Sequence, residues 1–312
     1  MEKHSLVFLL LFSSLIVVLS GIISVNGVYG QGEQENKNFS FNITQVTDSI
    51  YMLSGGGGNI GVSVGEDGIF LIDDKYTNVT DKLLNAIREI SDKPIKFIIN
   101  THWHPDHVGG NVKLGKTDSI IISHNNTRER LATEQFSSLR NTTIDPLPEA
   151  GLPIITFSDE MTFYFNNDVI NIIHIPNAHT DGDAIVHFNN SNVIHVGDIV
   201  SDTYFPFIDL PAGGSIEGVI NGVEKMILPL VNEQTKIIVG HGNVSTRDDI
   251  ISSLNMLKDI YNTISDAVIQ NKTLEQVHEI EPTKEYDEQY GDGSINSTQF
   301  TELVYNSLML QQ

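Results

Sequence analysis

Apolar residues near the start of the globular part of the chain alternate or run together in short segments. Such patterns predict β-strands. The expected strands cover residues 41–46, 49–53, 59–64 and 69–73. Four consecutive glycines at 55–58 and the triplet Glu66-Asp67-Gly68 are typical of the turns between them.

The pattern then alternates between helical and strand-like segments. Leu83, Leu84, Ile87 and Ile90 share helical spacing, which predicts a helix over 79–90, ended by Pro94. Strands at 95–100 and 119–123 and a helix at 126–139 are expected next, before a proline-rich loop at 141–153.

The second part of the chain repeats this order. Its predicted strands cover residues 156–165, 169–176, 184–188, 193–196 and 236–239. A helix is expected over 216–231, and the chain after Thr246 is expected to be largely helical, with a polar break at 285–294. Two similar halves, each a sheet with helices, predict an α/β (α+β) fold of four layers, with two sheets face to face and helices outside.

The composition is that of a globular protein, but the charge is unusual. The 312 residues carry a formal net charge of −22. Such a surface repels phosphate backbones, so we expect a small-molecule substrate and no nucleic acid, and we infer no protein partner. There are no cysteines, so any bound metal must use histidine and carboxylate ligands.

The N-terminus has the pattern of an export signal. Lys3 and His4 precede an uncharged, largely apolar run over 5–25, and a polar segment follows from residue 31. We expect a secretory signal within 1–30, or an uncleaved membrane anchor at 5–25, and hence a secreted or extracytoplasmic protein. A polar spacer (31–40), a main globular domain (41–262) and a helical C-terminal extension (263–312) complete the expected organisation.

The strongest chemical signal is the hexapeptide from His102 to His107, which reads HWHPDH. It follows a predicted strand, and residues two apart on extended chain point to the same side, so His102 and His104 can converge. Asp106 and His107 follow the bend at Pro105. Such dense clustering of imidazole and carboxylate groups is difficult to satisfy without a cation.

Three further residues lie at the ends of predicted strands in the second half. His179 follows one strand, Asp198 follows the strand at 193–196, and His241 stands between two glycines after the strand at 236–239. Loops at one edge of a sheet bring such side chains together. With the hexapeptide, they form a complete set of seven metal-binding candidates.

This ordered set resembles the metallo-β-lactamase superfamily over most of the chain from residue 41 to about 259. The resemblance implies an αβ/βα sandwich and two metals. His102, His104 and His179 would bind the first metal, Asp106, His107 and His241 would bind the second, and Asp198 would bridge them. Asp73 matches an acidic residue near the family's site, and we expect it to orient a ligand histidine.

Ligation by histidines and carboxylates without thiolates suits zinc, so two zinc ions per chain are expected. A water shared by two zinc ions loses a proton near neutral pH, and the resulting hydroxide would attack a carbonyl carbon. Asp106 would orient that hydroxide as well as bind metal. The expected enzyme is a zinc-dependent hydrolase of a β-lactam, a lactone or a thioester.

The segment after Asp198 is a candidate substrate wall, with Ser201, Tyr204 and Phe205 as its expected members. Ser201 departs from the family patterns. Many zinc β-lactamases have cysteine at the position of Asp198 and a substrate-binding lysine three residues later. Homoserine-lactone lactonases have a tyrosine at that later place, and Tyr204 is the nearest replacement here.

Other functions stay open from the sequence. Persulfide dioxygenases of the superfamily have a similar ligand set but bind one iron through two histidines and the aspartate. A lactonase or a glyoxalase-II-type hydrolase fits the bridging Asp198. A catalytically silent binding module and an RNA-processing nuclease are disfavoured by the intact ligand set and by the acidic charge, respectively.

Overall fold

The computed structural model describes residues 40–137 and 140–310. The predicted signal or anchor segment and all but the last residue of the predicted spacer lie outside these ranges. In the described ranges, no helix is both long enough and apolar enough to cross a bilayer.

Seven strands form the first sheet. In spatial order they are β1 (Asn42–Gln45), β2 (Ile50–Ser54), β3 (Ile60–Gly65), β4 (Gly68–Ile72), β5 (Ile95–Asn100), β6 (Ile120–His124) and β9 (Ile155–Phe157). The strands from β1 to β4 pair antiparallel, and those from β4 to β9 pair parallel. Every residue of β4 is buried because Phe70 and Ile72 face the second sheet while Ile69 and Leu71 face the outer helix α1 (Thr80–Ile90).

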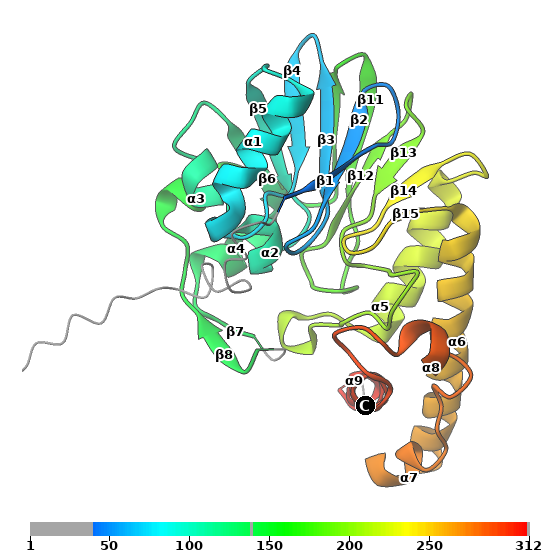
Figure 1. Cartoon of the computed structure of the whole chain (residues 1–312). Helices are drawn as coiled ribbons and strands as arrows, with labels where there is room; N and C mark the ends of the chain where they lie inside the picture. Colours follow the sequence, from blue (N-terminus) through cyan, green and yellow to red (C-terminus); the bar gives the residue numbers. More distant parts are fainter. Residues whose placement is uncertain (1–39, 138–139, 311–312) are drawn as a thin grey trace, which may run out of the picture.

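Six strands form the second sheet. They are β10 (Glu160–Phe165), β11 (Asp168–His174), β12 (Ala184–Phe188), β13 (Val193–His195), β14 (Lys236–Ile238) and β15 (Val244–Ser245). Apolar side chains from both sheets, among them Phe70, Ile99, Ile172 and Val186, pack in one core between them. The four-layer α/β sandwich expected from the order of elements is therefore confirmed (Figure 1).

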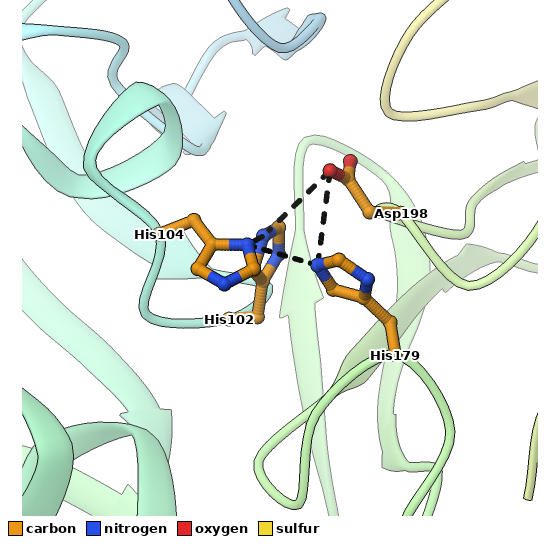
Figure 2. A group of neighbouring side chains, drawn as sticks. All are labelled: His102, His104, His179 and Asp198. Carbon is orange, nitrogen blue, oxygen red and sulfur yellow. Dashed lines mark hydrogen bonds and ion pairs between the residues drawn. The ribbon is translucent and has the colours of Figure 1, made fainter. Parts of the chain in front are cut away.

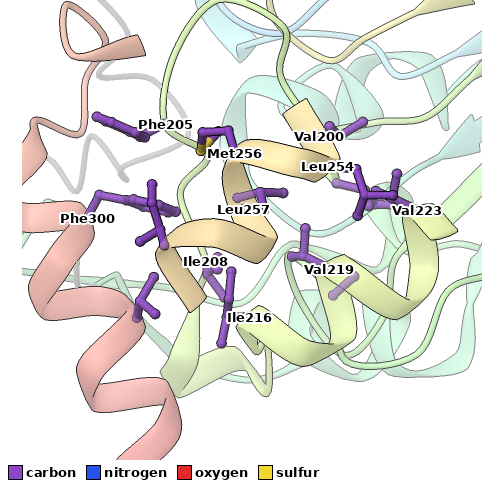
Figure 3. Packing of buried hydrophobic residues seen from close by; sticks show 14 of the residues in the cluster. Val200, Phe205, Ile208, Ile216, Val219, Val223, Leu254, Met256, Leu257 and Phe300 are labelled. Atoms are coloured by element: carbon purple, nitrogen blue, oxygen red, sulfur yellow. The ribbon is translucent and has the colours of Figure 1, made fainter. Parts of the chain in front are cut away.

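The second half contains the helices α5 (Ile216–Asn221), α6 (Arg247–Ile269), α7 (Leu274–His278), α8 (Asp287–Tyr290) and α9 (Ser297–Met309). Residues of α5 and α6 pack on the outer face of the second sheet, and α9 packs against α5, α6 and α7. Phe205 stacks on Phe300 of α9, with ring centroids 4.8 Å apart (Figure 3). The predicted C-terminal extension thus shares one apolar core with the elements that follow Asp198.

The sequence pattern was wrong about one helix. The helix expected over 126–139 is α4 (Asn125–Ala132), which stops at Thr133, where the backbone becomes extended. A short hairpin of β7 (Gln135–Ser137) and β8 (Thr142–Ile144) follows. In Figure 1 this hairpin lies below α4 and belongs to neither of the two large sheets.

Two other expected elements are interrupted. The helix expected over 216–231 is regular only through α5, because the chain continues as a π-helical turn from Gly222 and as a 3-10 turn containing Pro229. The strand expected over 156–165 is two strands, β9 and β10, which belong to different sheets.

Candidate metal centre

All seven predicted metal-binding side chains meet at one edge of the sandwich. His102 and His104 follow β5, and α2 (Pro105–Val108) carries Asp106 and His107. His179 lies between β11 and β12, Asp198 follows β13, and His241 follows β14. Two groups result, within each of which the candidate ligand atoms lie within 4.8 Å of one another: His102, His104, His179 and Asp198, and Asp106, His107 and His241.

Three imidazole nitrogens converge in the first group (Figure 2). Nδ1 of His104 lies 3.1 Å from Nε2 of His102 and 2.9 Å from Nε2 of His179. The other ring nitrogens bind protein groups. His104 Nε2 lies 2.9 Å from Asp209 Oδ2, and His179 Nδ1 donates to the carbonyl of Phe207 at 2.8 Å.

The second group is fixed by a buried carboxylate. Asp73 Oδ2 lies 2.7 Å from Nδ1 of His107, and both side chains are fully buried. Asp73 also accepts hydrogen bonds from the backbone N–H and the hydroxyl of Thr101. The structure thus places Asp73 where the resemblance implied, holding His107 so that its Nε2 points toward Asp106 Oδ2, 3.7 Å away.

The carboxylate of Asp198 lies between the two groups. Its Oδ2 lies 3.8 Å from Nε2 of His102 and 3.4 Å from Nε2 of His241. Its Oδ1 lies 3.2 Å from Nε2 of His107. One carboxylate therefore reaches ligand atoms of both groups.

The donor set fits a pair of divalent cations. Among the described residues, His107 Nε2 and Asp198 Oδ1 are buried without a hydrogen-bond partner, although they face each other. Buried polar atoms normally have a bonding partner, so a cation that binds both of these atoms would fit here. Two nitrogens bound to one tetrahedral zinc at its usual bond length are about 3.4 Å apart, close to the separations in the first group.

Burial favours the neutral form of two histidines of the first group. Burial, and then the neighbouring His104, lower the pKa of His179 to about 4, and burial also lowers the pKa of His102 well below its usual value. Neutral imidazoles offer the lone pair that a metal ion requires.

Nearby carboxylates determine the electrostatics of the second group. Burial opposes protonation of His241, but the Asp198 carboxylate outweighs it and raises the pKa of His241 to about 9. Burial also opposes ionisation of Asp198, yet the nearby His107 and His241 hold the pKa of its carboxyl well below the usual range. Both effects describe an anionic centre that attracts cations.

A cavity of about 510 Å³ opens onto the two groups. Ser201 and Tyr204 line it, as expected, together with Val200, Pro206 and Phe207. The Tyr204 hydroxyl donates to the backbone carbonyl of His241 at 2.9 Å. Phe205 is a correction to the predicted wall, because its side chain is fully buried against Phe300 in the core below.

Sequence reasoning missed several contributors to the centre. Asp209 and Phe207 orient ligand histidines, and a Cβ on Gly58 would overlap the ring of His107. The buried Lys75 donates to the carbonyls of Gly57 and Gly58 and so holds the glycine loop in place. None of these belongs to a local motif, and only the closeness of Asp209 to the predicted wall hinted at a role.

Four further histidines, His124, His174, His187 and His195, lie outside both metal-binding groups. His124 and His174 stack with ring centroids 3.7 Å apart, and each also binds a backbone carbonyl. His195 lies 3.3 Å from the carbonyl of Asn59. His187 belongs to β12 and is outside both metal-binding groups.

The fold and this set of residues define a metal-binding α/β sandwich of the hydrolase type. The model of the metallo-beta-lactamase superfamily matches residues 53–241, more than half of the chain. The chain therefore belongs to the metallo-beta-lactamase superfamily, whose members are mostly hydrolases.

Curated relatives and solved structures agree with this assignment. The chain is 28% identical over 170 residues to the hydroxyacylglutathione hydrolase GloC of Haemophilus influenzae, covering 53% of this chain and 77% of that protein. It is also 28% identical over 182 residues to a hydroxyacylglutathione hydrolase of Pelagibacter ubique, covering 55% of this chain and 65% of that one. A linear primary-alkylsulfatase of Pseudomonas is 22% identical over 255 residues, with coverage of 70% and 48%.

Two solved structures show the same fold. A metallo-beta-lactamase from Pontibacter korlensis superposes with a TM-score of 0.58 at 17% identity, covering 70% of this chain and all of that one. The sec-alkylsulfatase Pisa1 from Pseudomonas superposes with a TM-score of 0.61 at 15% identity, covering 85% of this chain and 50% of that one.

Proposed function

We propose that the chain is a binuclear zinc hydrolase of carbonyl substrates, with thioesters as the favoured class. The observation that carries this proposal is the position of Asp198, whose two oxygens reach ligand atoms of both groups. His102, His104 and His179 would hold one zinc, and Asp106, His107 and His241 the other. When bound, zinc supplies Lewis acidity toward water and toward a substrate carbonyl near neutral pH.

The choice among carbonyl substrates follows from residues and relatives. Asp198 occupies the place of the cysteine, and Ser201 that of the substrate-binding lysine, that many zinc β-lactamases have. Two curated relatives are hydroxyacylglutathione hydrolases. The departure from the β-lactamase pattern and the similarity to these two relatives both favour a thioester over a lactam.

The chain's own residues would position the reactants. Asp106 stays ionised because His107 and His241 overcome the effect of burial and lower the pKa of its carboxyl, so it can bind metal and orient an attacking water by accepting its hydrogen bond. Asp73 and Asp209 hold the rings of His107 and His104. Val200, Pro206 and Phe207 supply an apolar wall for the acyl group.

Substrate panels with defined metals test this proposal. The metal-free protein would be loaded with zinc or with iron(II) and assayed with S-lactoylglutathione, a γ-lactone, nitrocefin and an alkyl sulfate. We expect zinc to restore thioester hydrolysis and Asp198→Asn to abolish it. Asp81→Asn is the matched control, because Asp81 is exposed on α1 and pairs with Lys113. Oxygen consumption with glutathione persulfide by the iron form, without thioester hydrolysis by the zinc form, would overturn the proposal.

A further inference from the structure

The side chain of Arg140 brings a positive charge to the cavity wall, apart from the metal-binding residues. Among the described residues that line the cavity, Arg140 is the only arginine or lysine. It lies between β7 and β8, directly after the segment in which sequence reasoning expected a helix. No carboxylate in the described ranges lies within ion-pair distance of its guanidinium, whereas Arg130 and Arg247 each pair with an acidic residue.

Tyr76 holds Arg140 in place. The guanidinium donates to the Tyr76 hydroxyl, and its carbon lies 5.3 Å from the centre of the Tyr76 ring. Burial, and then the nearby Asp106, raise the pKa of Tyr76 to about 12, so the phenol is neutral at physiological pH. Tyr76 therefore orients the guanidinium without neutralising it.

Tyr76 also connects Arg140 to the metal centre. A Cβ built on Gly57 would lie 2.9 Å from the ring of Tyr76 and 2.9 Å from Cβ of Asp106, so Gly57 separates these two side chains by a single backbone layer. A molecule in this cavity can thus contact both the metal ligands and Arg140, because the same cavity is lined by both.

Another wall of the cavity has the opposite charge. Asp292, Gly293 and Ser294, from the loop between α8 and α9, line it, and Gly293 packs against Tyr204. With a formal net charge of −22 on the whole chain, the surroundings disfavour an anionic group, and Arg140 is the one lysine or arginine among the described residues lining the cavity. A guanidinium that has no ion-pair partner within the described residues can therefore bind a carboxylate selectively.

We propose that Arg140 is an anion-binding, specificity-determining residue, and that the substrate carries a carboxylate remote from the bond that is cleaved. This inference rests on the proposed hydrolase function. It assigns the β7–β8 hairpin a role in substrate selection, with Tyr76 as the positioning residue for Arg140.

A pair of esters with the same scissile bond tests this proposal. Mono-4-nitrophenyl glutarate carries a free carboxylate, and its methyl ester does not. For the zinc-loaded enzyme, Arg140→Gln is expected to raise KM for the anionic ester about tenfold, the loss expected for one charge-assisted hydrogen bond, and to leave the neutral ester within about twofold. Tyr76→Phe is expected to shift KM for the anionic ester in the same direction by a smaller factor.

Controls separate this inference from the proposed function. Arg88→Gln changes an exposed arginine on α1 that donates to the side chain of Asn85, and both esters are expected to be unaffected. Calorimetry gives a second readout, in which Arg140→Gln weakens binding of glutarate but not of monomethyl glutarate. Equal effects of Arg140→Gln on both esters, or no effect, would overturn the role of Arg140. If the wild-type enzyme cleaves neither ester nor any thioester, the hydrolase proposal itself fails.

Discussion

Asp209 Oδ2 lies 2.9 Å from Nε2 of His104, although the two residues are far apart in the sequence. Asp209 is buried, and its backbone N–H also donates to the carbonyl of His179. The carboxylate fixes the proton of His104 on Nε2 and leaves Nδ1 directed at the other imidazoles. One residue thus positions two members of the first metal-binding group.

Replacement of Asp209 is therefore expected to weaken metal binding. Asp209→Ala should lower the zinc affinity of the first group by about 10- to 100-fold, the usual cost of losing a carboxylate that orients a ligand histidine. Asp209→Asn, which retains an acceptor for Nε2, should lose less. Competition with a chromophoric chelator measures both, with Asp81→Asn as the control. Unchanged affinity in Asp209→Ala would show that the contact is incidental.

Gly58 is expected to tolerate no side chain. A Cβ there would overlap the imidazole of His107, so Gly58→Ala must displace the ring or the glycine loop. We expect loss of metal at the second group and a reduction of kcat/KM by more than about tenfold, since small misplacements at a reacting centre are costly. Metal analysis and kinetics check this expectation.

The same loop offers a matched control. Gly56 has φ 63°, a left-handed conformation that asparagine adopts more readily than most residues, and in the described ranges no neighbouring atom is close to the position of an added Cβ. Gly56→Asn should therefore retain metal and activity. If Gly56→Asn and Gly58→Ala fail equally, the loop is sensitive for a reason other than contact with His107.

The Tyr204 hydroxyl is expected to support structure and not to assist the reaction directly. It donates to the backbone carbonyl of His241. Burial raises the pKa of Tyr204 far above its usual value, so it is a poor proton donor. Tyr204→Phe should reduce kcat by less than about tenfold, the scale of one neutral hydrogen bond. A loss of 100-fold or more in kcat with KM unchanged would instead identify Tyr204 as a catalytic group.

His124 is expected to make stability sensitive to acid. Its Nδ1 accepts the N–H of Asn126 at the start of α4, and its Nε2 donates to the carbonyl of Ser158, so the ring must be neutral. Burial, and then His174, lower the pKa of His124. A depressed histidine pKa gives stability that is full above the ordinary value of about 6.5 and is lost as the pH falls through the folded-state value.

His124→Asn tests this expectation because asparagine caps helices without titrating. In chelator, urea unfolding at pH 7 and pH 5 should show wild type losing about 1 kcal/mol more than His124→Asn, the usual contribution of a helix cap. Asp159, His174 and Asp181 also lie near the ring and are common to both proteins, so their titration largely cancels. Equal losses in the two proteins would contradict the role of this cap.

Local pattern was sufficient for most of the fold. The strand expected at 95–100 is β5, that expected at 184–188 is β12, and the helix expected over 79–90 is α1 to within one residue. These segments are continuously apolar or strongly amphipathic, so their own sequence is enough to predict that they are buried. The seven metal-binding candidates were found for a similar reason, since each follows such a strand.

Features that depend on distant contacts were not predictable. The residues at 135–137 form a strand because β8 pairs with them. The helical pattern that precedes them does not indicate where the helix ends. Phe205 has the composition of a cavity wall, yet Phe300, nearly a hundred residues later, draws it into the core. Asp209 and Arg140 acquire their roles only when the fold brings them beside His104 and the cavity.

The metal content of the purified protein tests the central claim most directly. After loading with zinc and removal of excess, elemental analysis should give two zinc ions per wild-type chain. His241→Ala should retain one, because the first group keeps His102, His104 and His179. One metal ion per chain in both proteins, or a single iron that zinc does not displace, would contradict the binuclear centre and the hydrolysis proposed from it.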